Sequence, residues 1–294
     1  ERMTQQLWTV PESQSEVGTA DTGQKPSAIV VLYHGNCYDG FGAAWAAWKR
    51  LGEKATYIPV NYGASPPELP EGAAVWIVDF SYPRAMLEAL KARHPALEVL
   101  DHHKTAEADL RGLGYCTFDM EKSGARLAWE AFHAEDAPAM IRYIEDRDLW
   151  RFALPGSREV AAWMRSWPMD FGGWSYLADL MKDPEGRLAL IAEGKAILRF
   201  QSRQVDVMCE RSTTQLVGGH RVPVANATVF VSEVGERLCE LHPDASFAAY
   251  YLDRADGRRQ WGLRSRNGFD VSEVAKQYGG GGHAAAAGFT EAMR

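Results

Sequence analysis

The chain has 294 residues, of which 46% are hydrophobic and 24% are charged, so it can bury a sizeable core and is long enough for two domains. No apolar run approaches the roughly 18 residues that a membrane span needs, which predicts a protein without membrane contact. The formal net charge of −7 argues against a basic surface that grips long nucleic acid. An anionic substrate should therefore bind at one focused site.

The cysteines are widely spaced and include no CxxC pair: Cys37, Cys116, Cys209 and Cys239. This usage is typical of a reducing compartment, and we expect a cytoplasmic protein. Residues 1–27 are polar and lack a contiguous apolar segment, so we expect a flexible tail outside the fold. Because Met3 is not the first residue, whether this tail is wholly native stays open.

From residue 27 to residue 103, apolar runs alternate with helical segments. The expected strands are 27–34, 55–62, 73–81 and 97–103, and the expected helices are 40–52 and 83–95. Strands that alternate with helices predict right-handed βαβ units and a largely parallel sheet. The sequence therefore predicts an α/β fold.

The remainder of the chain predicts a helical region and a second, smaller α/β unit. Residues 122–150 are expected to form two helices that are split at Asp136 and Pro138, and a long helix is expected at about 183–210. Farther on, Asp256-Gly257 separates two strand-like runs, which indicates a hairpin. The expected organisation is a flexible tail, an α/β domain with a helical extension, a helical linker and a smaller α/β domain, at residues 1–27, 28–182, 183–210 and 211–294.

Three of the apolar runs end in side chains that can bind metal ions. They are His34 with Asp39, Asp79, and Asp101 with His102 and His103. The carboxyl ends of parallel strands share one edge of a sheet, so these groups should converge. Asp146 and Asp148, near a helix end, could close the same pocket, and of the two we favour Asp146 as a ligand.

Several carboxylates that lie close together repel one another unless a cation neutralises them. Oxygen ligands with a few imidazoles suit Mn²⁺ or Mg²⁺, whereas a thiolate-rich set would favour zinc. Two such ions held about 3.5 to 4 Å apart by a bridging carboxylate can activate water and neutralise a phosphoryl group. The sequence thus predicts a site for divalent cations such as Mn²⁺, Mg²⁺ or a similar ion, in two positions.

The motif "QYGGGGHAAAAGF" at residues 277–289 predicts a phosphate cradle. Its consecutive glycines are Gly279, Gly280, Gly281 and Gly282. Without side chains, their N–H groups can approach an anion, and His283 adds a donor. Upstream, Arg264 and Arg266 carry guanidinium groups that suit bidentate phosphate contact.

These motifs together resemble the DHH phosphoesterase family with its DHH-associated C-terminal domain. The matching segments are "DGFGAA", "VDFS", "DHH", "DRDLW" and "GGGGH", in the family's order over roughly residues 28–290. The resemblance implies metal-dependent hydrolysis of phosphodiester or phosphoanhydride bonds, usually with manganese, in a cleft between two domains. Within the family the chain is most similar to phosphodiesterases that degrade very short oligonucleotides, and to relatives that act on small nucleotides. The resemblance thus implies Mn²⁺ at two sites, with Mg²⁺ or Co²⁺ as alternatives.

The resemblance also implies roles for individual residues. One metal ion would be held by Asp39, Asp79, His102 and Asp146, and a second by His34, with Asp79 as the bridge. Asp101 and His103 would orient the ligands and contact the substrate as catalytic residues. His283 and the glycines at 279–282 would hold the substrate phosphate.

The first motif departs from the family pattern. Many members read HxxxDxD, whereas this chain reads "HGNCYD", which puts Cys37 near the expected first aspartate with one residue fewer. Either Cys37 binds metal as a thiolate, or Asn36 replaces it, or the His34 site binds weakly. A small buried residue is an equally good reading of Cys37.

The expected function is a metal-dependent, exonuclease-type phosphodiesterase, such as an oligoribonuclease, that hydrolyses short oligonucleotides or linear dinucleotides to mononucleotides. One alternative is an inorganic pyrophosphatase or another small-nucleotide phosphohydrolase. A third reading is a nucleotide-binding regulator without catalytic activity. A homodimer is compatible with each of them.

Overall fold

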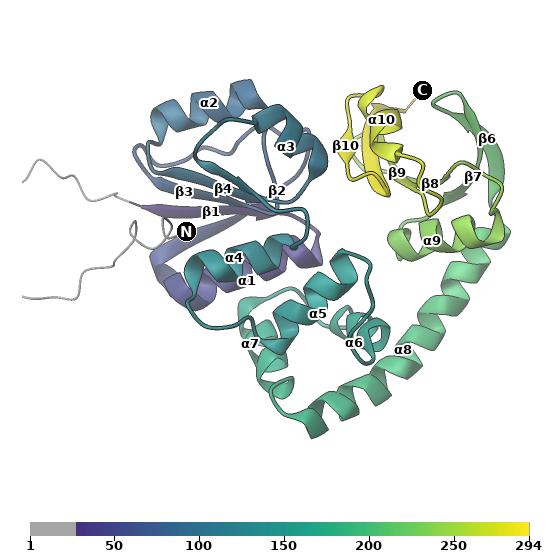
Figure 1. Ribbon diagram of the computed structural model, residues 1–294, viewed down its shortest axis with the longest axis horizontal. Coiled ribbons are helices and arrows are strands. Elements are labelled where there is room, and N and C mark those ends of the chain that lie inside the picture. Colours follow the sequence, from purple (N-terminus) through teal and green to yellow (C-terminus); the bar gives the residue numbers. More distant parts are fainter. Residues whose placement is uncertain (1–27, 294) are drawn as a thin grey trace, which may run out of the picture.

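The computed structural model describes residues 28–293, which form two sheets joined by a long helix (Figure 1). The tail expected at residues 1–27 lies outside the described residues. Within residues 28–293, none of the helices combines the length and the apolar character that crossing a bilayer requires.

The first sheet is parallel throughout, with the order β2-β1-β3-β4-β5. Its strands are β1 (Ile29–His34), β2 (Ala55–Val60), β3 (Ala74–Val78), β4 (Leu97–Asp101) and β5 (Cys116–Phe118). The α/β class and the parallel sheet that the alternating pattern predicts are thereby confirmed. All carboxyl ends of these strands lie at one edge of the sheet.

Helices cover both faces of this sheet, which explains why its central strands are apolar on both sides (Figure 1). The covering helices are α1 (Tyr38–Leu51), α2 (Arg84–Arg93), α3 (Lys104–Leu110) and α4 (Gly124–Phe132), with a short 3₁₀ turn at Gly52–Lys54. Helix α5 (Ala139–Asp148) packs against α1 and α4, on their side away from the sheet (Figure 1). Val31 belongs to the core between the sheet and helices α1 and α4, whereas Val30 and Leu32 belong to the core on the other face, with α2. The expected split into two helices around Pro138 is confirmed by α4 and α5.

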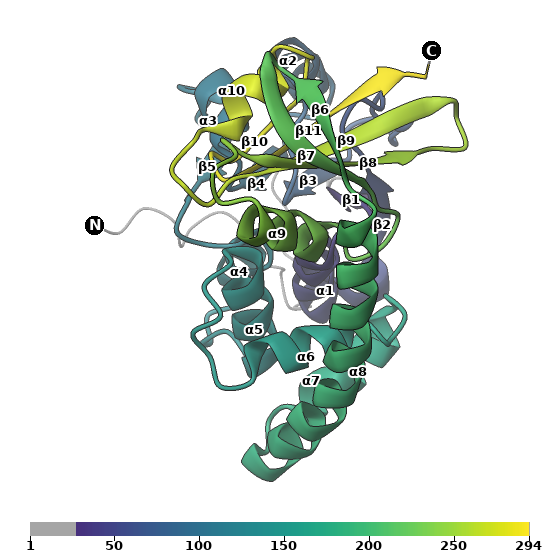
Figure 2. The same ribbon diagram turned by 90° about the vertical axis from the view of Figure 1, so that its right-hand side faces the viewer.

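A helical region then leads to the C-terminal part of the chain. It comprises α6 (Ser157–Met164), α7 (Phe171–Leu180) and α8 (Pro184–Glu210). The Asp183 carboxylate accepts a hydrogen bond from Gly186 N at 2.8 Å, and Pro184 occupies the first turn, so α8 has a well-defined beginning. Figure 2 shows α8 running from beside α7 up to the second sheet.

The second sheet is mixed, with the order β10-β11-β9-β8-β7-β6. Its strands are β6 (Thr213–Val217), β7 (His220–Asn226), β8 (Ala248–Asp253), β9 (Arg258–Arg264), β10 (Gly281–Gly282) and β11 (Ala286–Ala292), with helices α9 (Val231–Leu241) and α10 (Val271–Lys276). The hairpin expected at Asp256-Gly257 is confirmed by antiparallel β8 and β9, with Gly257 at φ 76°. The four-part division of the chain proposed above stays a proposal.

Contacts between the two parts of the chain bring β10 and α9 toward the carboxyl edge of the first sheet. Lys104 Nζ lies 2.5 Å from Asp270 Oδ2, and Arg158 pairs with Glu236 at 3.2 Å. A hydrogen bond also joins the two parts directly, because Gly282 N donates to Thr105 Oγ1 at 3.1 Å. These contacts fix which residues of the C-terminal part can reach the edge where the strands end.

Candidate functional site

The carboxyl edge of the first sheet gathers the polar side chains that the sequence singled out. His34 is the last residue of β1, Asp79 follows β3, and Asp101 ends β4. Asp79 has a φ of 56°, a left-handed conformation that is uncommon for residues other than glycine. Its N–H donates to Leu100 O at 2.9 Å, which anchors this turn to β4.

Asp39 reaches the same edge from the first turn of α1. Its buried carboxylate accepts hydrogen bonds from Gly124 N at 2.6 Å and Ala125 N at 3.0 Å, the amides that begin α4. The N-terminus of a helix stabilises a negative charge at this position. A Cβ at Gly124 would lie 2.4 Å from Asp79 Cβ, so glycine is required for this close approach.

The imidazole of His102 lies among three carboxylates. Its Nε2 is 3.1 Å from Asp79 Oδ1, 3.5 Å from Asp39 Oδ2 and 3.6 Å from Asp148 Oδ2. Burial lowers the pKa of His102, but the hydrogen bond to Asp79 and the nearby carboxylates outweigh it and raise that pKa to about 11. The site therefore attracts positive charge strongly.

The pKa values of the three carboxyl groups around His102 shift in different directions. Burial and the charge of Asp79 raise the pKa of Asp39 well above its usual value, and burial likewise raises the pKa of Asp148. Burial opposes ionisation of Asp79 as well, but hydrogen bonds from His102 and His34 hold its pKa well below the usual range. Three acids at this spacing compete for neutralisation, which a cation would supply.

Within residues 28–293, four groups of His, Cys and Asp side chains have ligand atoms within 4.8 Å of one another. They are His34–Cys37–Asp79, Asp39–His102–Asp148, Asp79–Asp101–His103 and His102–His103–His283. Among the described residues, His102 Nδ1 is buried without a hydrogen-bond partner, and the buried atoms His34 Nδ1 and Asp79 Oδ2 lie 3.5 Å apart, at the long limit of a hydrogen bond. Buried polar atoms are normally well satisfied, so these atoms fit a bound ion. The carboxylate and imidazole donors suit a divalent cation such as Mn²⁺ or Mg²⁺.

Asp101 holds His103 in place at the margin of these groups. Asp101 Oδ1 lies 2.7 Å from His103 Nδ1, and Oδ2 accepts from Ser81 Oγ at 2.6 Å. Burial disfavours the Asp101 charge, but the neighbouring His103 and Ser81 lower its pKa, so it remains a carboxylate. With Nδ1 engaged by Asp101, the Nε2 atom of His103 is left for other contacts.

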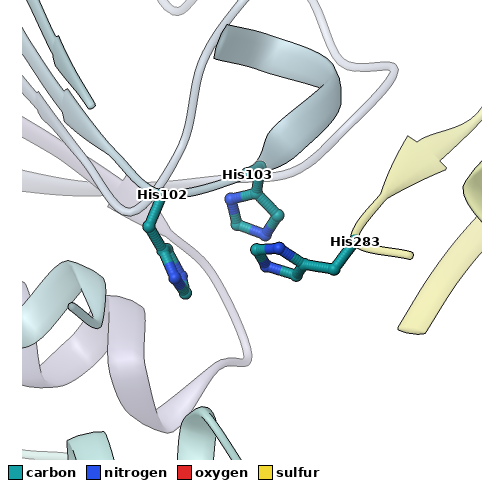
Figure 3. Close-up of side chains that lie close together, drawn as sticks. All are labelled: His102, His103 and His283. Carbon is teal, nitrogen blue, oxygen red and sulfur yellow. The ribbon is translucent and has the colours of Figure 1, made fainter. Parts of the chain in front are cut away.

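His283 reaches the cluster from the C-terminal part of the chain (Figure 3). Its ring stacks on His103 with a centroid distance of 4.8 Å and lies 5.0 Å from the ring of His102. Burial, together with the charges of His103 and His102, lowers the pKa of His283 to about 3. A neutral imidazole thus faces the cluster from the opposite side.

The structure places Asp148, and not the predicted Asp146, in the cluster. The Asp146 carboxylate accepts from Ala153 N at 2.9 Å and Leu154 N at 3.1 Å, and so closes the turn after α5. Two positions along a helix are rotated by roughly 200°, so the two side chains face different ways. Sequence alone offered no signal that separated them.

Two arginines predicted to bind phosphate are engaged elsewhere. Arg264 donates to Ser232 Oγ at 3.0 Å, and Arg266 pairs with Glu240 at 2.9 Å. Arg147, which was not predicted to bind substrate, lines the same pocket as Asp39 and Asp148. Its guanidinium donates to Glu233 of α9 at 3.2 Å. Its position between Asp146 and Asp148 in "DRD" was the signal that could have identified it.

Three of the four glycines before His283, at 280–282, lie in closely packed positions, whereas Gly279 has a positive φ of 74°. Three of their N–H groups have partners within the chain: Gly279 with Lys276 O, Gly280 with Ala275 O, and Gly282 with Thr105 Oγ1. A Cβ at Gly281 would lie 2.7 Å from Thr105 Oγ1. The expected cradle of free amides is therefore not seen, and the glycines instead let β10 approach α3 and deliver His283.

Cys37 occupies the N-cap position of α1, without a capping hydrogen bond from its side chain. Its Sγ belongs to the group formed with His34 and Asp79. Burial and the charge of Asp79 raise the pKa of the thiol, whereas His34 lowers it. Cys37 thus stands where the altered first motif needs a ligand, and its role there stays a prediction.

Comparisons with known proteins agree with this picture. Residues 231–292 match the model of the DHHA1 domain. The chain is 30% identical over 291 residues to the uncharacterized protein R106 of Acanthamoeba polyphaga mimivirus, with 90% of this chain and 68% of that protein covered.

Similar solved structures are more distant. An uncharacterized Helicobacter pylori G27 protein has a TM-score of 0.44 at 15% identity, covering 90% of this chain and 93% of that one. The pGpG-specific phosphodiesterase PggH of Vibrio cholerae has a TM-score of 0.42 at 15% identity, and the match covers 91% of this chain and 94% of that one. RecJ of Thermus thermophilus in complex with Mn²⁺ has a TM-score of 0.48 at 16% identity, and the match covers 91% of this chain and 49% of that one.

The mimiviral relative is similar over most of its length, and the DHHA1 match follows the "DHH" segment within one chain. This chain belongs to the same family as the mimiviral protein, and is a DHH family phosphoesterase with a C-terminal DHHA1 domain.

Proposed function

We propose that this protein is a metal-dependent phosphodiesterase that hydrolyses short oligonucleotides or linear dinucleotides to mononucleotides. The observation that carries the proposal is His102 among three carboxylates, of which Asp39 and Asp79 are buried and Asp148 is half-buried. Among the described residues, His102 Nδ1 is also buried without a hydrogen-bond partner. An arrangement of this kind is stable only when positive charge enters it. Membership of the DHH phosphoesterase family supports the same class of reaction.

The residues that would hold divalent cations are His34, Asp39, Asp79, His102 and Asp148. Asp79 is suited to a bridging role because it lies 3.5 Å from His34 Nδ1 and 3.1 Å from His102 Nε2. When bound, Mn²⁺, or Mg²⁺ or Co²⁺ in its place, would supply activation of water and neutralisation of phosphoryl charge.

His103 and His283 are the residues that would position the substrate. Asp101 fixes the ring of His103, so that Nε2 can contact a phosphate oxygen. His283 has a lowered pKa and adds hydrogen bonding without a permanent charge. Arg264 and Arg266 would have to leave Ser232 and Glu240 to reach the phosphate, so His283 is the contact that we retain from the C-terminal part.

A substrate panel tests the proposal. The protein is stripped with a chelator, Mn²⁺ is restored, and initial rates are measured on a linear dinucleotide, a cyclic dinucleotide and pyrophosphate. Asp79→Asn serves as the inactive variant and Asp136→Asn, at an exposed loop position, as the matched control.

We expect the linear dinucleotide to have the highest kcat/KM, with the control variant unchanged and Asp79→Asn inactive. Faster turnover of pyrophosphate with an inert dinucleotide would replace the proposal with a pyrophosphatase. Tight nucleotide binding with no turnover of any substrate would replace it with a nucleotide-binding regulator.

A further inference from the structure

A short turn after β2 places an aromatic side chain at the edge of the site. Ala64 N donates to Asn61 O at 3.1 Å, and Gly63 adopts a φ of 81°, a conformation that a glycine tolerates in a tight turn. The residue at the tip is Tyr62, two positions after the end of β2. Because β2 pairs in parallel with β1, this turn lies at the same edge as His34.

The ring of Tyr62 is packed against the histidines of the site. Its centroid lies 5.2 Å from that of His34 and 5.7 Å from that of His103, both in edge-to-face geometry, and 4.6 Å from that of Phe80. Even so, 47% of the residue is exposed. The turn therefore presents a braced aromatic surface directly beside the groups that would hold a phosphate.

We propose that Tyr62 stacks against the nucleobase of the substrate and so makes the site selective for nucleotides. The inference rests on the proposed function. A phosphate held at His103 leaves its nucleoside to extend beyond the cluster, where the ring of Tyr62 offers an uncharged face. Stacking on an aromatic ring favours any base over none, because every base has a π-face.

Stacking would also help a nucleotide to bind at a site that is rich in carboxylates. A neutral ring adds affinity for a nucleotide without adding another charge to the cluster. Pyrophosphate gains nothing from this ring, so Tyr62 would separate nucleotide substrates from inorganic ones. The phenol hydroxyl is not needed for stacking, which distinguishes this role from that of a proton donor.

The test compares dinucleotides with and without bases. We would measure kcat/KM with Mn²⁺ for a normal dinucleotide and for two analogues in which one or the other nucleoside is abasic. The proteins are the wild type, Tyr62→Ala, Tyr62→Phe and the control Tyr176→Ala, which removes another exposed tyrosine, from α7. Mn²⁺ affinity is measured for each protein, so that any displacement of His34 is detected.

We expect Tyr62→Ala to lower kcat/KM about tenfold on the normal dinucleotide and to leave turnover of one abasic analogue unchanged, with Mn²⁺ affinity intact. Tyr62→Phe and Tyr176→Ala should behave as the wild type. Equal losses on the normal and both abasic substrates, or the same loss in Tyr62→Phe, would overturn the stacking role. If the wild type cleaves no dinucleotide, the proposed function itself has failed.

Discussion

At the scale of single residues, Asp146 and Asp148 have separate tasks although they are two positions apart. Asp148→Asn should lower Mn²⁺ affinity at least about tenfold while leaving the thermal midpoint of the metal-free protein little changed. Asp146→Asn should leave Mn²⁺ affinity little changed but lower the free energy of unfolding by about 1 to 3 kcal/mol, because the amides of Ala153 and Leu154 lose a carboxylate acceptor. Calorimetric titration with Mn²⁺ and denaturant unfolding measure the two effects. Loss of metal binding in Asp146→Asn alone would reverse the assignment.

Cys37 gives a second test at this scale, because a thiolate ligand and a packed thiol respond differently to replacement. If Cys37 binds metal, Cys37→Ala should weaken Mn²⁺ binding severalfold and Cys37→Asp should keep part of the affinity. Binding isotherms for the two variants at the same pH provide the measurement. Unchanged stoichiometry and affinity in Cys37→Ala would establish the packing role instead.

Most of the candidate site could be predicted from residue types at strand ends, because the topology of a parallel sheet brings those ends together. His34 and His102 both lie against Asp79 for this reason. Asp148 could not be chosen over Asp146, since that choice depends on how α5 is rotated against the sheet. The contacts of Arg264 depend on Ser232, a partner on another element that no local pattern reveals.

At the scale of elements, the junction between α2 and β4 contains a fully buried histidine, His94. Burial and the neighbouring Arg93 lower its pKa below the ordinary value of 6.5. In the unfolded chain the imidazole takes up a proton near that ordinary value, whereas in the folded protein it stays neutral to lower pH. The contribution of neutral His94 to the free energy of unfolding should therefore be fully present above about pH 6.5 and fall as the pH drops below that value.

The slope from one such group approaches about 1.4 kcal/mol per pH unit. Denaturant unfolding from pH 8 to pH 5 measures it, with His94→Leu as the variant that cannot titrate. We expect the difference in unfolding free energy between wild type and variant to shift against the wild type below pH 6.5. A constant difference over this range would show that His94 does not contribute to acid sensitivity.

Elements with strong local signals could be predicted, and elements that depend on distant contacts could not. The alternation of apolar and helical segments predicted the parallel sheet, and Asp256-Gly257 predicted the hairpin of β8 and β9. The two-residue strand β10 is different, because Gly282 is held by Thr105, 177 positions away in the sequence. Its glycines suggested an anion cradle, while the fold uses them for packing against α3.

At the scale of the whole molecule, the substrate must fit between parts of the chain that are already joined by ion pairs. Lys104 with Asp270 and Arg158 with Glu236 link the two parts near the site, and the chain carries a net charge of −7. Affinity for long polynucleotides normally accumulates through many basic contacts. We therefore expect dimers to about pentamers to be cleaved with a higher kcat/KM than a 20-mer, with a salt dependence of only a few phosphate contacts.

Initial rates over this length series at two salt concentrations measure the effect. Oligomers of one composition keep base preference out of the comparison. A steady rise in kcat/KM out to the 20-mer, with a steep dependence on salt, would instead show a long binding track.

The central claim is that the side chains gathered around His102 bind a divalent cation and that hydrolysis depends on it. The most direct measurement follows dinucleotide hydrolysis by chelator-treated protein during a titration with Mn²⁺, with bound metal counted in the same samples. We predict no product before Mn²⁺ is added, and a rate that rises in proportion to occupancy until the sites are filled. Hydrolysis that persists in the chelator, or filled sites without any product, would contradict the account.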